Sequence, residues 1–171
     1  MAFKPDILVL DATAFIRLDF PQLQAISNVL FFTTQNVVLE LKDPRSQMNL
    51  DILKYSDRLK VSSPQNKLVK EMEKRIQLID PQTTLSSTDI EILALTHQLN
   101  GTLVSNDLSL QNIALHYNIP VKVVSGKKIT FLRKWQLKCK SCGKKTEDTV
   151  ENCSFCGGIL KRVQKKKPNQ I

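Results

Sequence analysis

The chain has 171 residues and a net charge of +9, a length that fits one domain with a real hydrophobic core plus a small appendage. No apolar run is longer than four residues, whereas a membrane-spanning helix needs about 20. The N-terminal residues MAFKPDILVLD carry an acid where a signal peptide has an apolar stretch. We therefore expect a cytoplasmic protein with no membrane partner.

The positive charge lies in the last quarter of the chain. Residues 1–125 contain 12 basic and 13 acidic side chains, and residues 126–171 contain 13 basic and 3 acidic ones. A neutral body that carries a basic segment indicates binding of a polyanion. A solvated lysine tail would explain residues 165–167, but the other ten basic residues surround a set of cysteines.

The body alternates strand-like and helix-like stretches. Strands are expected at 6–10, 29–33, 60–63 (an edge strand), 102–105 and 121–124. Helices are expected at 12–18, 21–28, 35–42, 46–59, 64–79, 88–100 and 109–118. In the helix at 88–100, Ile90, Leu93, Ala94 and His97 mark one face and Gly101 ends it. This alternation favours an α/β fold with a parallel sheet flanked by helices.

Four segments follow from this division. We predict a body at 1–125, a basic linker or edge strand at 126–135, a cysteine module at 136–163 and a disordered basic tail at 164–171.

Two CxxCG motifs, ten residues apart, make up the cysteine module. Two residues between cysteines let one tight turn direct both sulfurs at one ion, and the following glycine permits a positive φ. Four thiolates suit a closed, tetrahedral Zn²⁺ site; iron in a rubredoxin-like site and a pair of disulfides are the alternatives. The predicted ligands are Cys139, Cys142, Cys153 and Cys156.

Basic side chains before and within this module are candidates for contacts with RNA phosphates, which would make binding salt-dependent. They are Lys127, Lys128, Arg133, Lys134, Lys138, Lys140, Lys144 and Lys145, with Lys161 and Arg162 nearby. Trp135 and Phe155 could stack on unpaired bases. Alternatively, Trp135 packs between the two parts of the chain.

Four acids stand where parallel α/β folds place functional groups. Asp11 and Asp107 follow strands, Glu40 lies on a short helix, and Asp89 opens the long helix. Singly, each has a structural explanation, such as a helix cap, a helix-dipole contact or a solvated surface position. Together they would repel one another unless a hard cation such as Mg²⁺ or Mn²⁺ neutralised them. The carboxyl edge of a parallel sheet is also where ligands bind.

The motifs LVLDATAFI, VVLELKD, SSTDIEILAL and LVSNDLSLQNIA resemble, in order and spacing, those of the PIN nuclease family. The resemblance spans roughly residues 6–124. It implies a PIN-like fold in which Asp11, Glu40, Asp89 and Asp107 bind catalytic Mg²⁺ or Mn²⁺. It also implies that the hydroxyls of Thr13 and Ser105 lie near the metals or the scissile phosphate. Relatives often have two adjacent acids where this chain has Asn106 before Asp107.

With the predicted zinc ribbon, the chain is similar to the NIN-one-binding endonucleases in their short archaeal form. That resemblance implies hydrolysis of precursor small-subunit ribosomal RNA at its mature 3′ end, leaving a 3′-hydroxyl and a 5′-phosphate. The implied partners are precursor rRNA, the precursor of the small ribosomal subunit, and a KH-domain assembly factor. Two alternatives remain, a toxin-type PIN nuclease and a non-catalytic RNA-binding assembly factor. Only Gly101 precedes residue 126, which excludes a glycine-rich phosphate loop.

Overall fold

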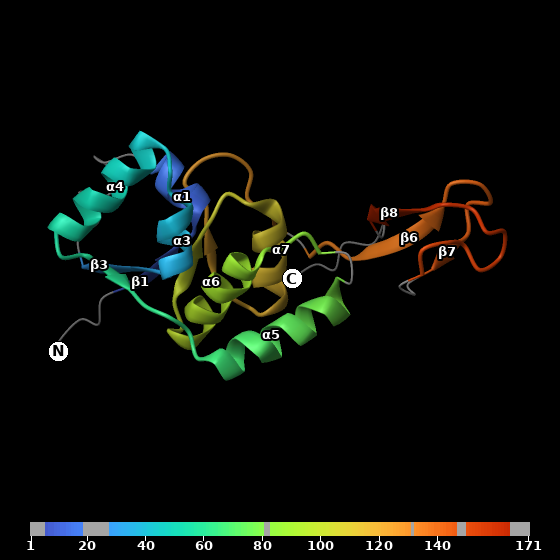
Figure 1. Ribbon diagram of the computed structural model, residues 1–171, viewed down its shortest axis with the longest axis horizontal. Coiled ribbons are helices and arrows are strands. Elements are labelled where there is room, and N and C mark those ends of the chain that lie inside the picture. The colour runs from blue at the N-terminus through green and yellow to red at the C-terminus, as the bar shows by residue number, and fades with distance from the viewer. Residues whose placement is uncertain (1–5, 19–27, 81–82, 131, 147–149, 165–171) are drawn as a thin grey trace.

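A five-stranded, all-parallel sheet forms the centre of the body in the computed structural model, which describes residues 6–18, 28–80, 83–130, 132–146 and 150–164 (Figure 1). The strand order is β3-β2-β1-β4-β5. The strands are β1 (Asp6–Leu10), β2 (Val29–Thr33), β3 (Leu59–Val61), β4 (Thr102–Val104) and β5 (Val121–Lys122). The predicted parallel α/β sheet is therefore confirmed, with β1 at its middle.

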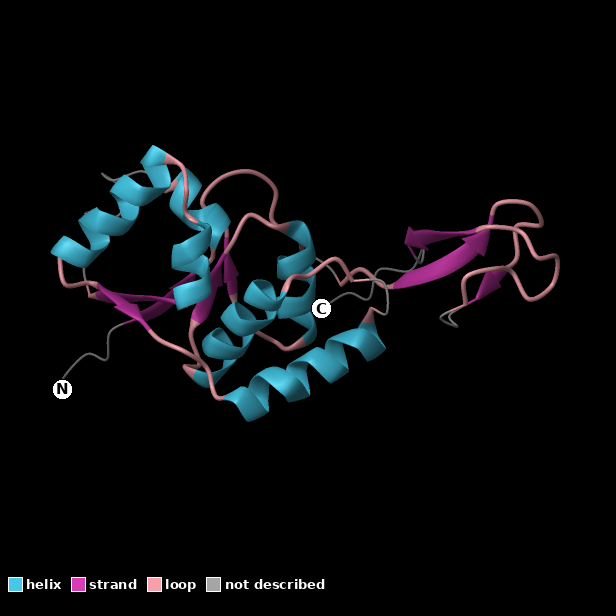
Figure 2. Cartoon of the chain, in the orientation of Figure 1, coloured by secondary structure: helices cyan, strands magenta, loops and turns pink. Residues whose placement is uncertain are grey.

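Helices pack around this sheet (Figure 2). They are α1 (Ala12–Arg17), α3 (Gln35–Glu40), α4 (Pro44–Tyr55), α5 (Asn66–Ile79), α6 (Ser87–Gln98) and α7 (Leu108–His116). The predicted helix at 21–28 falls, except for its last residue, outside the described residues. In the described parts of the chain, no helix combines the length and the apolar character that crossing a membrane requires.

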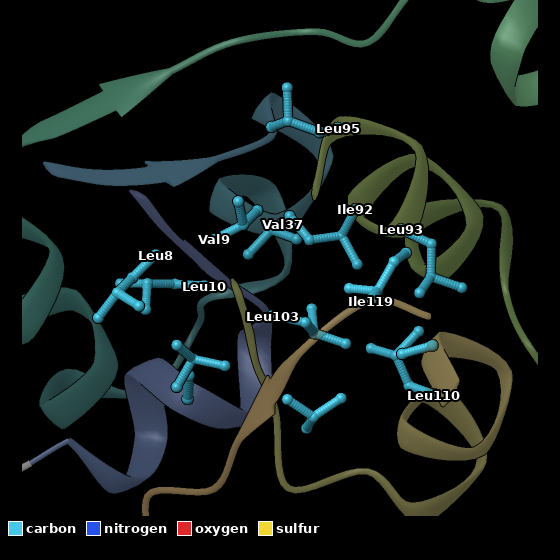
Figure 3. Packing of buried hydrophobic residues seen from close by; sticks show 14 of the residues in the cluster. Leu8, Val9, Leu10, Val37, Ile92, Leu93, Leu95, Leu103, Leu110 and Ile119 are labelled. Carbon is cyan, nitrogen blue, oxygen red and sulfur yellow. The ribbon is translucent and has the colours of Figure 1, made fainter. Parts of the chain in front are cut away.

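The long helix α6 is buried around most of its circumference (Figure 3). Ile92, Leu93 and Leu95 are fully buried, and α6 packs against α5, α3 and α7 as well as against β1 and β4. The prediction that His97 shares one face of this helix with Ile90, Leu93 and Ala94 is therefore wrong in part, because His97 is exposed. The helix ends at Gln98 with Leu99 as its C-cap, and Asn100 after it takes the left-handed conformation (φ 49°) that was expected of Gly101.

A separate antiparallel sheet follows the body and extends away from it (Figure 1). Its order is β7-β6-β8, with β6 at Trp135–Cys139, β7 at Lys145–Thr146 and β8 at Leu160–Gln164. We call this unit the ribbon. Gln164, which the sequence placed in a disordered tail, pairs with Trp135 at the end of β8. Residues 165–171 lie outside the described residues.

Between the body and the ribbon, the described residues 126–130 and 132–134 include positions that contact α7. Ile129 is buried, and its backbone N–H donates to the side-chain oxygen of Gln111 at 3.0 Å. The N–H of Arg133 donates to Asn112 Oδ1 at 2.8 Å, and the Asn112 amide donates back to the Arg133 carbonyl at 3.1 Å. In the described residues of the segment expected to be a linker or edge strand (126–135), only Trp135 lies in a strand, as the first residue of β6. The side chains of Gln111 and Asn112 on α7 hold the part that precedes it.

Candidate active site and metal centre

The carboxyl ends of β1 and β4 lie side by side at the middle of the sheet. Leu10 pairs with Val104 in the parallel register, and the N–H of Asp11 donates to the Val104 carbonyl at 3.2 Å. The chain moves outward from β1 to β2 and β3, then returns to β4 and β5 on the other side. Asp11 and Ser105 therefore follow the two strands that flank the topological switch point, where open α/β sheets bind ligands.

Asp11 is a buried carboxylate held by several donors. It caps α1, and its Oδ1 accepts hydrogen bonds from the backbone N–H groups of Thr13 and Ala14. The Ser105 hydroxyl donates to its other oxygen, Oδ2. Only 4% of Asp11 is exposed, and this burial raises its pKa even though the hydrogen bonds from Ser105 and Thr13 lower it. Charge on this group is therefore costly unless a cation approaches it.

Ser105 connects Asp11 to Asp107. Its hydroxyl oxygen, fully buried, accepts the backbone N–H of Asp107 at 3.0 Å while donating to Asp11. Asp107 caps α7 through Oδ1, which accepts the N–H groups of Ser109 (2.6 Å) and Leu110 (3.0 Å). Its second oxygen, Oδ2, takes no part in these bonds, so the structural role of Asp107 leaves one oxygen available to a ligand.

Asn106, which precedes Asp107, has a structural role in this fold. Its side-chain oxygen accepts the backbone N–H of Val124 at 3.1 Å and that of Ser125 at 3.5 Å. Its own backbone N–H donates to the Thr13 hydroxyl at 2.9 Å. The Asn106 side chain thus connects the chain after β5 to the loop after β4 by hydrogen bonds. The backbone N–H of Asn106 also fixes Thr13 beside the Asp11–Ser105–Asp107 group.

Glu40 and Asp89 lie on two helices that contact each other. Asp89 forms a capping box with Ser86 at the start of α6, which uses its Oδ2. Glu40 is exposed at the last residue of α3. One turn earlier on α3, the Asn36 amide donates to Glu91 of α6 at 2.7 Å. This bond joins α3 to the first turns of α6.

The structure therefore brings together only part of the predicted catalytic set. Hydrogen bonds join Asp11, Thr13, Ser105 and Asp107. Within the described residues, the one group of three or more acidic, histidine or cysteine side chains placed to hold an ion consists of the four cysteines. Glu40 and Asp89 do not join Asp11 and Asp107 in a second such group.

The four cysteine sulfurs form a compact cluster at the tip of the ribbon. All four thiols are free, their Sγ atoms lie within 4.8 Å of one another, and Cys139–Cys156 and Cys142–Cys153 are 3.5 and 3.6 Å apart. A tetrahedral ion with Zn–S bonds of about 2.3 Å would require sulfur–sulfur distances of about 3.8 Å. The cluster thus fits one tetrahedral metal ion and not a disulfide.

The two CxxCG turns have matching backbone geometry. In each, the glycine N–H donates to the carbonyl of the first cysteine, at 3.1 Å for Gly143 and 2.8 Å for Gly157. Both glycines adopt the predicted positive φ, 73° and 69°. The backbone N–H of Cys142 approaches the Cys139 sulfur and lowers its pKa to about 6. That shift favours the thiolate, the form that binds a metal.

Most of the predicted RNA-contacting side chains are solvent-exposed. Exposed members are Lys127, Lys128, Lys134, Lys140, Lys144 and Lys145, whereas Arg133 and Lys138 are half-buried. Phe155 is 70% exposed, with the Lys144 ammonium 4.3 Å from its ring centre. Trp135 is half-buried, and the Arg162 guanidinium lies 4.0 Å from its ring centre.

Comparison with known proteins identifies the family. A family model described as the PIN domain of ribonuclease matches residues 8–99. Endoribonuclease Nob1 of Methanocaldococcus jannaschii is 30% identical over 164 residues, covering 94% of this chain and 79% of that protein. The chain is a PIN-domain endoribonuclease of the Nob1 family. The expected enzyme class, a divalent-metal-dependent endoribonuclease, is therefore confirmed.

Two further relatives and one solved structure are also similar to this chain. Ribonuclease VapC1 of Thermoplasma acidophilum is 29% identical, covering 96% of this chain and 82% of that one. The 20S-pre-rRNA D-site endonuclease NOB1 of Saccharomyces cerevisiae is 32% identical over 61% of this chain and 22% of its own length. The structure of VapBC2 from Rickettsia felis matches 68% of this chain and 98% of its own (TM-score 0.50, 19% identity), which supports the PIN fold alone.

Sequence reasoning missed Asp80 and Asn112, which join the PIN domain to the ribbon. Asp80, at the C-terminal cap of α5, forms an ion pair with Arg162 of β8. Asn112 holds the backbone of Arg133. The sequence gives little sign of either contact, because the two partners of each are distant along the chain.

Proposed function

We propose that the Asp11–Ser105–Asp107 edge, together with Glu40 and Asp89, holds Mg²⁺ or Mn²⁺ and hydrolyses precursor small-subunit rRNA at its mature 3′ end. The observation that carries the proposal is the buried Asp11 carboxylate at the switch point, joined through the Ser105 hydroxyl to the loop of Asp107. The family membership supplies the reaction class.

The residues present fit a hard divalent cation. Asp11 is an acid whose burial raises its pKa, so a nearby positive ion would stabilise its ionised form. Asp107 Oδ2 is free of the α7 cap, and the Glu40 carboxylate is exposed. Carboxylate and hydroxyl oxygens are the ligands that Mg²⁺ and Mn²⁺ prefer.

The protein residues orient the reacting groups. Ser105 fixes the rotamer of Asp11, and the N-terminal turn of α1 keeps the other oxygen in place. Asn106 fixes Thr13, whose hydroxyl is then directed toward the same edge. A cation held by these carboxylates would supply an activated water for attack on phosphorus and would stabilise the leaving oxygen. No side chain needs to form a covalent bond with RNA, and the expected products carry 3′-hydroxyl and 5′-phosphate ends.

The substrate assignment rests on the relatives and the ribbon. The yeast relative is named a 20S-pre-rRNA D-site endonuclease, and the ribbon of this chain carries exposed lysines suited to RNA phosphates. We propose Zn²⁺ as the ion of the cysteine cluster, with a structural role in presenting those lysines. The small-subunit precursor and a KH-domain factor that positions it complete the proposed partners. The proposed units are the PIN domain at 1–125 and the ribbon at 136–163.

The test is a cleavage assay on precursor rRNA with Mn²⁺ and mapped product ends. Asp11→Asn should abolish cleavage and leave RNA binding nearly unchanged, because the substitution is close in shape and removes none of the basic side chains proposed to contact RNA. Asp51→Asn, an exposed acid on α4, is the matched control and should cleave normally. Equal cleavage by Asp11→Asn and the unchanged chain would refute the catalytic assignment and favour a non-catalytic assembly factor.

A further inference from the structure

An aromatic side chain is exposed beside the cysteine cluster at the tip of the ribbon. Phe155 stands between the two cysteines of the second CxxCG turn, and 70% of it is exposed. Among the described residues of the ribbon, the buried ones are Leu137, Cys139 and Cys153, so Phe155 adds little to the ribbon core. A single exposed phenylalanine is common on protein surfaces, and its position and neighbours therefore decide whether it binds a partner.

The backbone that carries Phe155 is held on both sides. The N–H of Cys153 donates to the Gly158 carbonyl at 2.9 Å, and the N–H of Gly157 donates to the Cys153 carbonyl at 2.8 Å. The sulfurs of Cys153 and Cys156, on either side of Phe155, belong to the cluster that fits one metal ion. A ring on such a turn loses little backbone freedom when it binds a partner, and this preorganisation favours binding.

The ring of Phe155 keeps an accessible face. The Lys144 ammonium lies over one face, 4.3 Å from the ring centre. Because one ammonium covers only part of that face and 70% of the residue is exposed, the opposite face and the ring edge are largely open to solvent. An exposed aromatic face on a basic protein surface is where unpaired nucleic-acid bases stack.

The charge around the ring selects the kind of partner. The described residues of the ribbon contain six basic side chains and one acid, Glu151, and the sequence has two more acids at 147 and 148. Lys140, Lys144 and Lys145, in or next to the first CxxCG turn, are exposed, and the sulfurs of the two turns come within 3.5 Å. An aromatic ring among ammonium groups matches single-stranded RNA, which offers both stacking bases and negative phosphates.

We propose that Phe155 stacks on one unpaired base of the substrate RNA, while Lys144 contacts a phosphate next to that base. The proposal rests on the proposed function in one respect, that the chain acts on RNA. It goes further because the ribbon extends away from the PIN domain (Figure 1), so the stacked base lies away from the bond to be cut. The substrate must therefore carry an unpaired nucleotide remote from its cleavage site.

Two substitutions of Phe155 separate stacking from simple apolar contact. They are made in the zinc-loaded full chain with Asp11→Asn and without Mg²⁺ or Mn²⁺, and binding of labelled hexauridine RNA is followed by fluorescence anisotropy. Phe155→Leu keeps an apolar side chain without a π-face, and it should weaken binding about tenfold, within the range for loss of one stacked base. Phe155→Tyr keeps the face and should bind as tightly as the unchanged side chain.

Ile159→Ala is the matched control. Ile159 is 63% exposed, and its carbonyl accepts the N–H of Lys140 in the first CxxCG turn at 2.9 Å. Its removal should change the RNA affinity by less than about twofold, because an aliphatic side chain offers no face for stacking. Since Phe155 and Ile159 are both exposed, neither substitution should disturb folding, which the melting temperature checks.

A tryptophan at position 155 gives a direct signal of stacking. Trp135 is the single tryptophan of the chain, so combining Trp135→Phe with Phe155→Trp leaves all tryptophan emission at the tip of the ribbon. Hexauridine should quench this emission to saturation. A hexamer of the same ribose-phosphate backbone without bases should cause little quenching. If Trp135→Phe disturbs the ribbon, the anisotropy series decides alone.

Four outcomes would overturn the proposal. The chain with Phe155 intact could fail to bind hexauridine, or Phe155→Leu could bind it equally well, which would leave the exposed ring to a protein partner. Ile159→Ala could weaken binding as much as Phe155→Leu, or bound hexauridine could leave the emission at position 155 unchanged. All four are measured without cleavage. Failure of the Asp11→Asn cleavage test would therefore leave this binding intact, and the two proposals fail separately.

Discussion

Ser105→Ala is the substitution that probes the active-site edge most directly. The Ser105 side chain is fully buried, donates to Asp11 and accepts from the Asp107 backbone. Alanine removes both bonds and leaves the Asp107 N–H without its partner. It also removes one of the hydrogen bonds that lower the pKa of Asp11, so the pKa of that carboxyl should rise further.

The size of the effect follows from the two lost bonds. A hydrogen bond to a charged group contributes about 1.5–3 kcal/mol, and a buried donor left unpaired costs about 1–3 kcal/mol. Because the two share one hydroxyl, we expect a total loss of about 3 kcal/mol in the free energy of unfolding. For a chain of this length, that corresponds to a decrease in melting temperature of about 6–12 °C. Cleavage should fall about 10–100-fold, the usual effect of removing a group that orients a metal ligand.

Thr96→Val is the matched control. Thr96 is also fully buried, and its hydroxyl donates to the Ile92 carbonyl at 2.6 Å within α6. It should lose about 1 kcal/mol and cleave at the normal rate. The two variants are compared by urea unfolding and by single-turnover cleavage with Mn²⁺ below their melting temperatures. Normal cleavage by a folded Ser105→Ala protein would refute the role of Ser105 in positioning Asp11.

Three further predictions concern the acid, the cluster and the lysines. Without added Mg²⁺ or Mn²⁺, Asp11→Asn should be more stable than the unchanged chain at pH 7 by urea unfolding. Burial raises the folded-state pKa of Asp11. The protonated Asp11 side chain therefore contributes its full stability below its unfolded pKa of about 4, and this contribution is lost as pH rises through the folded-state pKa. An equal difference in the free energy of unfolding between the two proteins at about pH 4 and pH 7 would contradict this. Cys139→Ser should lose stoichiometric zinc by atomic absorption and weaken RNA binding, while the PIN domain keeps its melting transition; full zinc occupancy would refute the ligand set. Lys144→Ala should reduce the slope of log affinity against log salt by about 0.7 on single-stranded RNA, and Lys54→Ala on α4 should not.

Local patterns were sufficient to predict most of the secondary structure. The strands at Asp6–Leu10 and Val29–Thr33 have the predicted bounds, because each is an apolar run that ends at a helix-capping residue. Helix α4 starts at Pro44, earlier than predicted, since the Asp43 side chain caps it and proline suits the first turn. Strand order depends on long-range pairing, so only its parallel character could be predicted.

The site illustrates a different limit. The explanation of Asp11 and Asp107 as caps is correct. Asp89, expected to favour the helix dipole, lies in the first turn of α6 and also takes part in the capping box of Ser86. These structural roles coexist with the proposed catalytic ones, because a cap can use a single oxygen. The sequence motifs were therefore sufficient to identify the candidate acids. Their relation through Ser105 depends on a contact across 94 residues, and the pairing of Asp80 with Arg162 spans 82. Composition and periodicity carry no information about such contacts.

Helix α7 has a consequence for where the enzyme cuts. Its first turn is capped by Asp107, while Gln111 and Asn112, one turn later, hold the chain that leads to the ribbon. On the roles proposed for Asp107 and for the ribbon lysines, this one helix would fix the distance between the metal site and the bound RNA, and with it the position of the cut. Loss of the hydrogen bonds from the Gln111 and Asn112 side chains should leave the cleavage rate unchanged but spread the cleavage position over several neighbouring nucleotides.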